Sequence, residues 1–265
     1  MEALLEIAVK AAIAGGEEIL KVYDTDDFGV EVKGDNSPLT KADKAAHLAI
    51  VSYLNKTDVP ILSEEGKHDA YVTRSGWETL WIVDPLDGTK EFIKRNGEFT
   101  VNIALVKNGK PVAGVIYVPV KKTLYFASLE MGAFKCEAVE GSDFTKSLAD
   151  FKNQSMALPV SKERPFTIVG SRSHMSPETE EYIRSLEAKH GSVEVMSVGS
   201  SLKICMVAEG SADEYPRFAP TMEWDTAAGQ AIAEGAGFRM LQGLTEEPVR
   251  YNKEDLLNPW FIVKR

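Results

Sequence analysis

Apolar and polar residues follow a helical period at the start of the chain. Between residues 3 and 22, apolar side chains recur at intervals of three and four positions, which is typical of an amphipathic helix with one buried face. Thr40 occupies the place of a helix N-cap. The sequence therefore predicts a second helix over residues 41–55.

The middle of the chain changes to short apolar runs rich in β-branched and aromatic residues, which are typical of buried strands. The dipeptide Asn108-Gly109 lies between two such runs and predicts a tight hairpin. Residues 123–128 predict a third antiparallel strand beside that hairpin. The strands predicted in this region cover residues 59–62, 80–83, 99–106, 111–118 and 123–128.

The second half alternates between strand and helix patterns. We predict strands over residues 166–170 and 193–198, and helices over residues 177–189, 200–209 and 225–234. Ser176 and Pro177 form a favourable start for the first of these helices. Residues 137–154 are polar and irregular in pattern, so we expect two lobes, 1–154 and 155–265. The fold class predicted from these patterns is α+β, with sheets and helices in layers.

Composition limits the possible classes of protein. The 265 residues are 44% hydrophobic and 26% charged, as in globular domains with a substantial core. The acidic N-terminal segment lacks the features of a secretory signal. No apolar stretch approaches the length of a membrane-spanning helix, so no integral membrane segment is expected. The two cysteines provide no disulfide framework, which favours a reducing cytoplasm.

The net charge bears on the kind of ligand. A formal charge of −10 argues against broad nucleic-acid binding, which requires a basic surface. A small phosphorylated ligand remains compatible with an acidic protein, because bound cations can invert the local field.

The strand predicted at residues 80–83 is followed by the segment Asp84-Pro85-Leu86-Asp87-Gly88-Thr89. Asp, Pro and Gly are common in surface turns, so a turn is one interpretation. The other is a metal site, because two neighbouring carboxylates repel each other unless a cation or a proton lies between them. This segment alone does not decide between the two.

Three further carboxylates lie at ends of predicted elements. Glu64 follows a strand, Asp225 opens a helix, and Asp43 lies three residues after Thr40. Oxygen ligands without Cys or His suit a hard cation such as Mg²⁺. Taken singly, Glu64 could belong to a solvated turn, Asp43 to a helix capping box, and Asp225 to an N-cap.

These motifs together resemble the inositol monophosphatase superfamily of Mg²⁺-dependent, lithium-sensitive phosphatases. The resemblance rests on residues 84–89, with residues 63–65 upstream and 224–229 downstream, and it extends over essentially the whole chain. Further segments resemble the bacterial 3′(2′),5′-bisphosphate nucleotidases within it: residues 36–43, 90–93, 95–100, 171–174, 199–203 and 215–218. The resemblance implies an α/β/α/β/α sandwich.

The resemblance also implies roles for individual residues. Two or three Mg²⁺ ions would be held by Glu64, Asp84, Asp87, Asp225 and the backbone carbonyl of Leu86. Asp43 and Thr89 would be the catalytic pair that acts on a metal-activated water, which attacks the phosphate in line. The implied substrate-binding residues are Glu64, Asp87, Gly88, Thr89, Ser171, His174, Gly199, Lys203, Arg217 and Asp225.

The implied reaction converts adenosine 3′,5′-bisphosphate, a by-product of sulfate assimilation, to AMP and phosphate. The substrates would include 3′-phosphoadenylyl sulfate, and the partner is thus a small phosphorylated nucleotide. We expect a monomer or homodimer in the cytoplasm, with peripheral association at the inner face of the membrane left open. The alternatives are an inositol or sugar monophosphatase and a non-catalytic nucleotide sensor. An intact metal-ligand set argues against the sensor.

Overall fold

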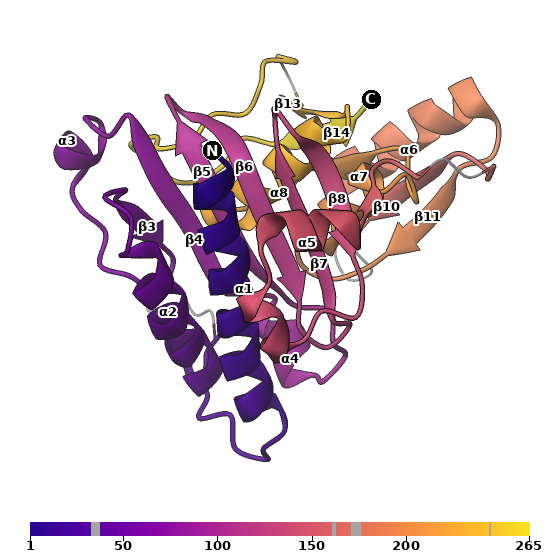
Figure 1. Ribbon diagram of the computed structural model, residues 1–265. Coiled ribbons are helices and arrows are strands. Elements are labelled where there is room, and N and C mark those ends of the chain that lie inside the picture. Colours follow the sequence, from indigo (N-terminus) through magenta and orange to yellow (C-terminus); the bar gives the residue numbers. More distant parts are fainter. Residues whose placement is uncertain (33–37, 161–162, 171–175, 244) are drawn as a thin grey trace.

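The computed structural model describes residues 1–32, 38–160, 163–170, 176–243 and 245–265. Its layers follow the order helix, sheet, helix, sheet, helix (Figure 1). Helices α1 (Glu2–Tyr23) and α2 (Lys41–Leu54) cover one face of a seven-stranded sheet. Helices α7 (Leu202–Ala208) and α8 (Glu223–Gly235) cover its other face. The α+β class predicted from the sequence is confirmed.

The large sheet contains seven strands in the order β3-β4-β5-β6-β7-β8-β9. Their bounds are β3 (Ile61–Ser63), β4 (Thr79–Asp87), β5 (Thr100–Lys107), β6 (Lys110–Val118), β7 (Thr123–Ser128), β8 (Gly132–Cys136) and β9 (Met156–Ala157). Only β3 and β4 run parallel, and every other neighbouring pair is antiparallel. The short elements beside this sheet are β1 (Glu31–Val32), β2 (Pro38–Leu39), α3 (Tyr71–Arg74), α4 (Thr89–Ile93), the 3₁₀ helix η1 (Gly141–Thr145) and α5 (Leu148–Asn153).

The second half supplies the outer layers. A βαβ unit consists of β10 (Thr167–Gly170), α6 (Pro177–His190) and β11 (Glu194–Ser197), with the two strands parallel. A three-stranded antiparallel sheet has the order β12-β14-β13, formed by β12 (Tyr215–Arg217), β13 (Arg239–Gln242) and β14 (Phe261–Lys264). Ser176 caps α6 by accepting a hydrogen bond from the Thr179 amide at 3.3 Å, as the predicted helix start requires.

Strand β4 is buried on both faces. Trp81 and Val83 pack in the hydrophobic cluster beneath α1 and α2, whereas Leu80 and Ile82 pack in the cluster beneath α7 and α8. Successive side chains of a strand point to opposite faces. A strand that is covered on both faces therefore has apolar residues at consecutive positions, which is the pattern at residues 80–83.

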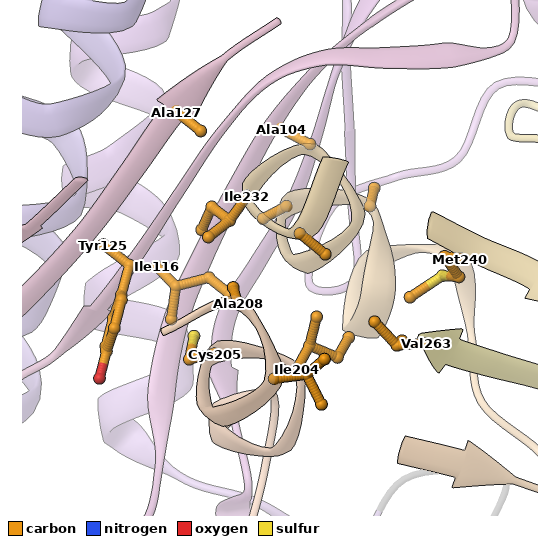
Figure 2. Packing of buried hydrophobic residues seen from close by; sticks show 14 of the residues in the cluster. Ala104, Ile116, Tyr125, Ala127, Ile204, Cys205, Ala208, Ile232, Met240 and Val263 are labelled. Atoms are coloured by element: carbon orange, nitrogen blue, oxygen red, sulfur yellow. The ribbon is translucent and has the colours of Figure 1, made fainter. Parts of the chain in front are cut away.

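Helix α8 lies in close contact with β6. A Cβ atom at Gly114 would come within 2.4 Å of the carbonyl oxygen of Ala228, so no side chain fits there. Around this contact Ile116, Ile204, Cys205 and Ile232 form part of one buried cluster (Figure 2). The small residue thus lets the helix that carries Asp225 approach the sheet.

The predicted hairpin is confirmed. Strands β5 and β6 pair antiparallel with Lys107 opposite Lys110. The two residues between them have positive φ, 51° at Asn108 and 72° at Gly109. A tight hairpin turn of this kind requires positive φ at both central residues, which Asn-Gly tolerates well.

Several local predictions were wrong in detail. The strand predicted to end at Val83 continues through Asp87, with a register shift in its pairing with β5. The helix predicted from Ser200 begins at Leu202, since Ser200 has a φ of 56°. The helix predicted from Asp225 begins two residues earlier, at Glu223. The 137–154 segment, predicted to be irregular, contains η1 and α5.

The predicted division into lobes 1–154 and 155–265 stays a prediction. Residue 154 lies between α5 and β9, and one hydrophobic cluster includes residues of both halves. Among the residues that the structure describes, no helix combines the length and the apolar composition that crossing a membrane requires.

Candidate active site and metal centre

Strand pairing brings the first two carboxylates together. Because β3 and β4 run parallel with Ser63 opposite Val83, the next residues, Glu64 and Asp84, lie beside each other. The amide of Glu64 donates to the carbonyl of Val83 at 3.1 Å and continues this pairing. Asp84 is only 1% exposed. The carboxylates of Glu64 and Asp84 therefore lie side by side at the C-terminal end of the paired segment of β3 and β4.

Asp87 and Asp225 complete a cluster with Asp84. One carboxylate oxygen from each of the three residues lies within 4.8 Å of the others. The chain between Asp84 and Asp87 is shaped by the register shift in β4 and by a hydrogen bond from the Leu86 amide to Asp84 Oδ1 at 3.1 Å. Asp225 comes from the distant helix α8. The cluster is therefore a product of the tertiary fold.

The electrostatics of this cluster favour a bound cation. Burial, and then the charges of Glu64, Asp87 and Asp225, hold the pKa of Asp84 well above its usual value. Burial, and then the charge of Asp87, likewise hold the pKa of Asp225 well above its usual value. Divalent cations would relieve both effects, and an all-oxygen donor set suits Mg²⁺. The residues present therefore fit such an ion.

The first turn of α8 orients Asp225. As the third residue of the helix, its carboxylate oxygen Oδ2 accepts a hydrogen bond from the amide of Met222 at 2.8 Å. The alternative that Asp225 is itself the N-cap is wrong, because the cap is Met222. Asp225 thus combines a helix-capping contact with membership of the carboxylate cluster.

Asp43 and Thr89 lie in contact. Asp43 is 2% exposed, and its Oδ2 accepts hydrogen bonds from the Thr40 amide at 2.7 Å and the Thr40 hydroxyl at 2.5 Å. Its other oxygen, Oδ1, accepts from the Thr89 hydroxyl at 3.2 Å. The hydroxyl also lies 3.4 Å from the carbonyl oxygen of Leu86. Capping and contact with Thr89 therefore use different oxygens and do not exclude each other.

Gly88 allows a close approach between the two halves of the chain. Its φ of 94° belongs to the left-handed region, which disfavours residues with a side chain. A Cβ atom here would lie 3.3 Å from the Glu98 carbonyl oxygen and 3.3 Å from Ser200 Cβ. The turn after Asp87 can consequently fit beneath the segment that precedes α7.

Sequence reasoning missed the residues that hold Asp87. Its Oδ2 accepts hydrogen bonds from the Ser200 hydroxyl at 2.6 Å, and from the amide and hydroxyl of Ser201, each at 2.7 Å. The side-chain amide of Asn102 lies at 3.4 Å from the same oxygen. The available signal was Asn102 itself, a polar residue within the apolar run of β5.

A cleft of about 500 Å³ lies beside the carboxylate cluster. Of the substrate-binding residues predicted, Asp87, Gly88, Gly199, Lys203, Arg217 and Asp225 line it, while Glu64 and Thr89 do not. Lys90, Lys94, Glu91 and Glu98 also line it and were not predicted. Ser171 and His174 lie outside the described residues.

The cations in the cleft differ in exposure: Lys203 is buried, Arg217 is partly buried, and Lys90 and Lys94 are exposed. Lys203 is 9% exposed, its Nζ donates to the Ser200 carbonyl at 2.9 Å, and burial lowers its pKa. Arg217 donates from Nη2 to the Pro220 carbonyl at 3.0 Å, whereas its buried Nε has no hydrogen-bond partner within the described part of the chain. The amide of Gly199 donates to Glu98 Oε2 at 2.9 Å.

Comparison with known proteins identifies the class to which this fold and site correspond. The sequence profile of the inositol monophosphatase family matches residues 1–259, and the chain belongs to that family. The family predicted from the motifs is thereby confirmed.

Within the family, the similarity is strong to proteins called CysQ. The chain is 45% identical to the 3′(2′),5′-bisphosphate nucleotidase CysQ of Escherichia coli strain K12, over 98% of this chain and 99% of that protein. The crystal structure of CysQ from Bacteroides thetaiotaomicron is 60% identical, covers 100% of this chain and 97% of its own, and gives a TM-score of 0.92. The suhB protein of Bartonella henselae is 25% identical over 99% of this chain and 94% of its own, with a TM-score of 0.74.

Proposed function

We propose that this protein is a Mg²⁺-dependent 3′(2′),5′-bisphosphate nucleotidase that hydrolyses adenosine 3′,5′-bisphosphate to AMP and phosphate. The observation that carries the proposal is the joining of two features in one cleft: the carboxylates of Asp87 and Asp225, and the cations Lys203 and Arg217. A nucleotide with two phosphates offers one to each feature. The similarity to the CysQ nucleotidases over nearly the whole of both chains supports this reading.

Glu64, Asp84, Asp87, Asp225 and the Leu86 carbonyl are the groups that would hold two or three Mg²⁺ ions. When bound, Mg²⁺ neutralises charge that develops on phosphate oxygens and lowers the pKa of a coordinated water. The buried position of Asp84 excludes bulk solvent from one side of this centre. Interactions in such an enclosed site are stronger than the same interactions in water.

We assign to Asp43 and Thr89 the removal of a proton from the attacking water. The hydroxyl of Thr89 is 3.2 Å from Asp43 Oδ1, while the other oxygen of Asp43 is held by Thr40. Thr89 accepts a hydrogen bond from the water, and its own proton is shared with Asp43. The water oxygen forms a bond to phosphorus as the bond from phosphorus to the ribose 3′ oxygen breaks. One proton of the water passes through Thr89 to Asp43 and the other stays on the released phosphate, while the ribose oxygen takes a proton from solvent and becomes the 3′ hydroxyl of AMP.

Lys203 and Arg217 bind the phosphate that is not hydrolysed. Lys203 is buried and Arg217 partly buried, and the Nε–H of Arg217, which has no partner among the described residues, can donate a hydrogen bond to an anion. An Arg side chain can also stack on a base while it pairs with phosphate. The substrate 3′-phosphoadenylyl sulfate carries the same 3′ phosphate and is expected to be hydrolysed as well. We propose the cytoplasm as the site of the reaction, in keeping with two cysteines that are free and buried.

A phosphate-release panel tests this function. With Mg²⁺ present, the purified protein should release phosphate rapidly from adenosine 3′,5′-bisphosphate, and much more slowly from inositol 1-phosphate or fructose 1,6-bisphosphate. AMP serves as the control, since it keeps only the 5′ phosphate and should be stable. Preference for inositol 1-phosphate would establish the monophosphatase alternative, and tight nucleotide binding without phosphate release would establish the sensor.

A further inference from the structure

Asp87 is held by donors that come from a distant part of the chain. The hydroxyls of Ser200 and Ser201 and the amide of Ser201 all donate to its Oδ2 at 2.6–2.7 Å. Within the described part of the chain, the hydrogen bonds to Asp87 end on Oδ2. Oδ1 is therefore the oxygen that this arrangement leaves for a cation.

The donors belong to a directed and buried network. The hydroxyl of Thr100 donates to Asn102 Oδ1 at 2.8 Å, and Asn102 Nδ2 donates to Ser201 Oγ at 2.9 Å. Thr100, Asn102 and Ser201 are 0%, 1% and 4% exposed. Unpaired polar groups are costly in such surroundings, so these hydrogen bonds restrict the orientations open to each side chain.

Ser201 also connects two different elements of the carboxylate cluster. Its hydroxyl lies 2.7 Å from Asp87 Oδ2 and 2.6 Å from the backbone carbonyl of Asp225. A hydroxyl has one proton, so it donates to one of these oxygens at a time and stays within reach of the other. One side chain thus links the end of β4 to the start of α8.

The backbone that carries these serines is held by several further contacts. Ser200 has a φ of 56°, which is uncommon for a residue with a side chain. Its hydroxyl lies 2.8 Å from Thr100 Oγ1, its carbonyl accepts from Lys203 Nζ, and the preceding amide of Gly199 donates to Glu98. Such a conformation persists only where the surroundings determine it, which makes the segment a rigid support.

We propose that Ser201, oriented by Asn102 and Thr100, is a positioning residue that keeps the Asp87 carboxylate in the cluster and thereby sets the affinity of the site for Mg²⁺. The inference rests on the metal site of the proposed function and is independent of which phosphorylated compound is the substrate. Groups that orient the ligands of a metal typically change metal affinity or activity by about 10–100-fold when they are removed.

The test measures Mg²⁺ affinity of the full-length chain by titration calorimetry, without substrate. Ser201→Ala should weaken Mg²⁺ binding by about 10–100-fold, and Ser201→Thr, which keeps the hydroxyl, should recover most of the loss. The matched control is Ser128→Ala. Ser128 is 3% exposed and its hydroxyl accepts a hydrogen bond from the Met131 amide, remote from the carboxylates, so the affinity should be unchanged.

A second variant keeps the test decisive if Ser201→Ala folds poorly. Thr100→Val removes a hydroxyl that contacts both Asn102 and Ser200, and it should weaken Mg²⁺ binding in the same direction by a smaller factor. Turnover of both variants should recover toward the wild-type value as Mg²⁺ is raised, which a purely structural defect would not show. Unchanged Mg²⁺ affinity in well-folded Ser201→Ala and Thr100→Val would overturn the inference.

Failure of the wild type to hydrolyse the bisphosphate would overturn the proposed function instead, while the affinity comparison would still decide the role of Ser201.

Discussion

The carboxylates of the metal centre and the cations that line the cleft have opposite requirements. Burial and the neighbouring carboxylates raise the pKa of Asp84, so its charged form needs a cation. Burial lowers the pKa of Lys203, so its charged form benefits from an anion. The carboxylate cluster is therefore defined without any substrate. The cations are expected to distinguish one phosphorylated compound from another.

The two groups also differ in how they are held. Glu64 and Asp84 are placed by the register of two parallel strands, which is a backbone property. Lys203 and Arg217 each donate to a backbone carbonyl three residues away. Changes to the carboxylates should therefore abolish the chemistry, whereas changes to the cations should shift substrate preference.

The largest effect is expected from Asp84→Asn and Asp87→Asn. Loss of a metal-binding carboxylate removes several kcal/mol of transition-state stabilisation, or about 10³-fold or more in turnover. The metal-free proteins should melt no lower than the wild type, since the change reduces repulsion among carboxylates. The measurements are phosphate release and thermal melting. Wild-type turnover by either variant at limiting Mg²⁺ would refute the assignment of the metal centre.

Asp43→Asn should produce the next largest effect, because Asp43 both caps α2 and contacts Thr89. Loss of a cap costs about 1 kcal/mol of stability. Loss of a general base costs about 10²–10⁴-fold in turnover. Both should be visible when melting temperature and turnover are measured on the same sample.

A matched control for this variant exists in α5. Asp150 caps that helix in the same way, with its Oδ2 accepting from the Ser147 amide at 3.0 Å and the Ser147 hydroxyl at 2.6 Å. Asp150→Asn should lower the melting temperature and leave turnover unchanged. If Asp43→Asn behaves in the same way as Asp150→Asn, then Asp43 is only a cap.

Lys203→Ala and Arg217→Ala should act on binding. Each variant removes a charged partner of the second phosphate. A hydrogen bond to a charged group contributes about 1.5–3 kcal/mol to binding, so KM for the bisphosphate should rise about 10–100-fold. Turnover should fall far less, because the contact is the same in ground state and transition state. Hydrolysis of inositol 1-phosphate, weak in the wild type, should hardly change. An unaltered KM in both variants would place the second phosphate elsewhere.

The smallest effect concerns stability and pH. The raised pKa values of Asp84 and Asp225 mean that the metal-free fold binds protons more strongly than the unfolded chain. Their contribution to stability is therefore present at low pH and is lost as pH rises through the folded-state pKa values. Mg²⁺ should compensate at pH 7.5 and less at pH 5, where protons compete with it. At about 100 times its Kd it should add about 2.7 kcal/mol.

Thermal melting with and without Mg²⁺ at the two pH values measures this difference. The melting temperature should rise by several degrees at pH 7.5, and by less at pH 5. NaCl at equal ionic strength is the control and should have little effect. An equal Mg²⁺-induced shift at both pH values would show that the buried carboxyl groups do not bind the ion.

Much of the fold could be predicted because its signals are local. The hairpin at Asn108-Gly109 and the cap at Ser176 depend on the conformational preferences of two or three residues, and both are confirmed. Strands β12, β13 and β14 were not predicted. Each is short, with three residues in β12 and four in each of the others, so a periodic pattern has little length in which to appear.

The same contrast holds for the candidate site. The motif at residues 84–89 predicted neighbouring carboxylates, and the structure brings Asp84 and Asp87 together with Asp225. The support of Asp87 by Ser200, Ser201 and Asn102 could not be predicted, because serine and asparagine occur in many contexts and these residues come from separate elements.

By itself, the sequence determined which chemical groups are available: oxygen ligands in the motifs at residues 63–65, 84–89 and 224–229, an Asn-Gly turn, and continuous apolar runs suited to strands buried on both faces. These properties depend on residue types and short spacing. Only the tertiary structure decided that Oδ2 of Asp87 is already engaged, and that Ser201 lies between Asp87 and Asp225. Such contacts join residues far apart in the chain. They are fixed by the packing of α8 against the sheet and by the register of β3 with β4.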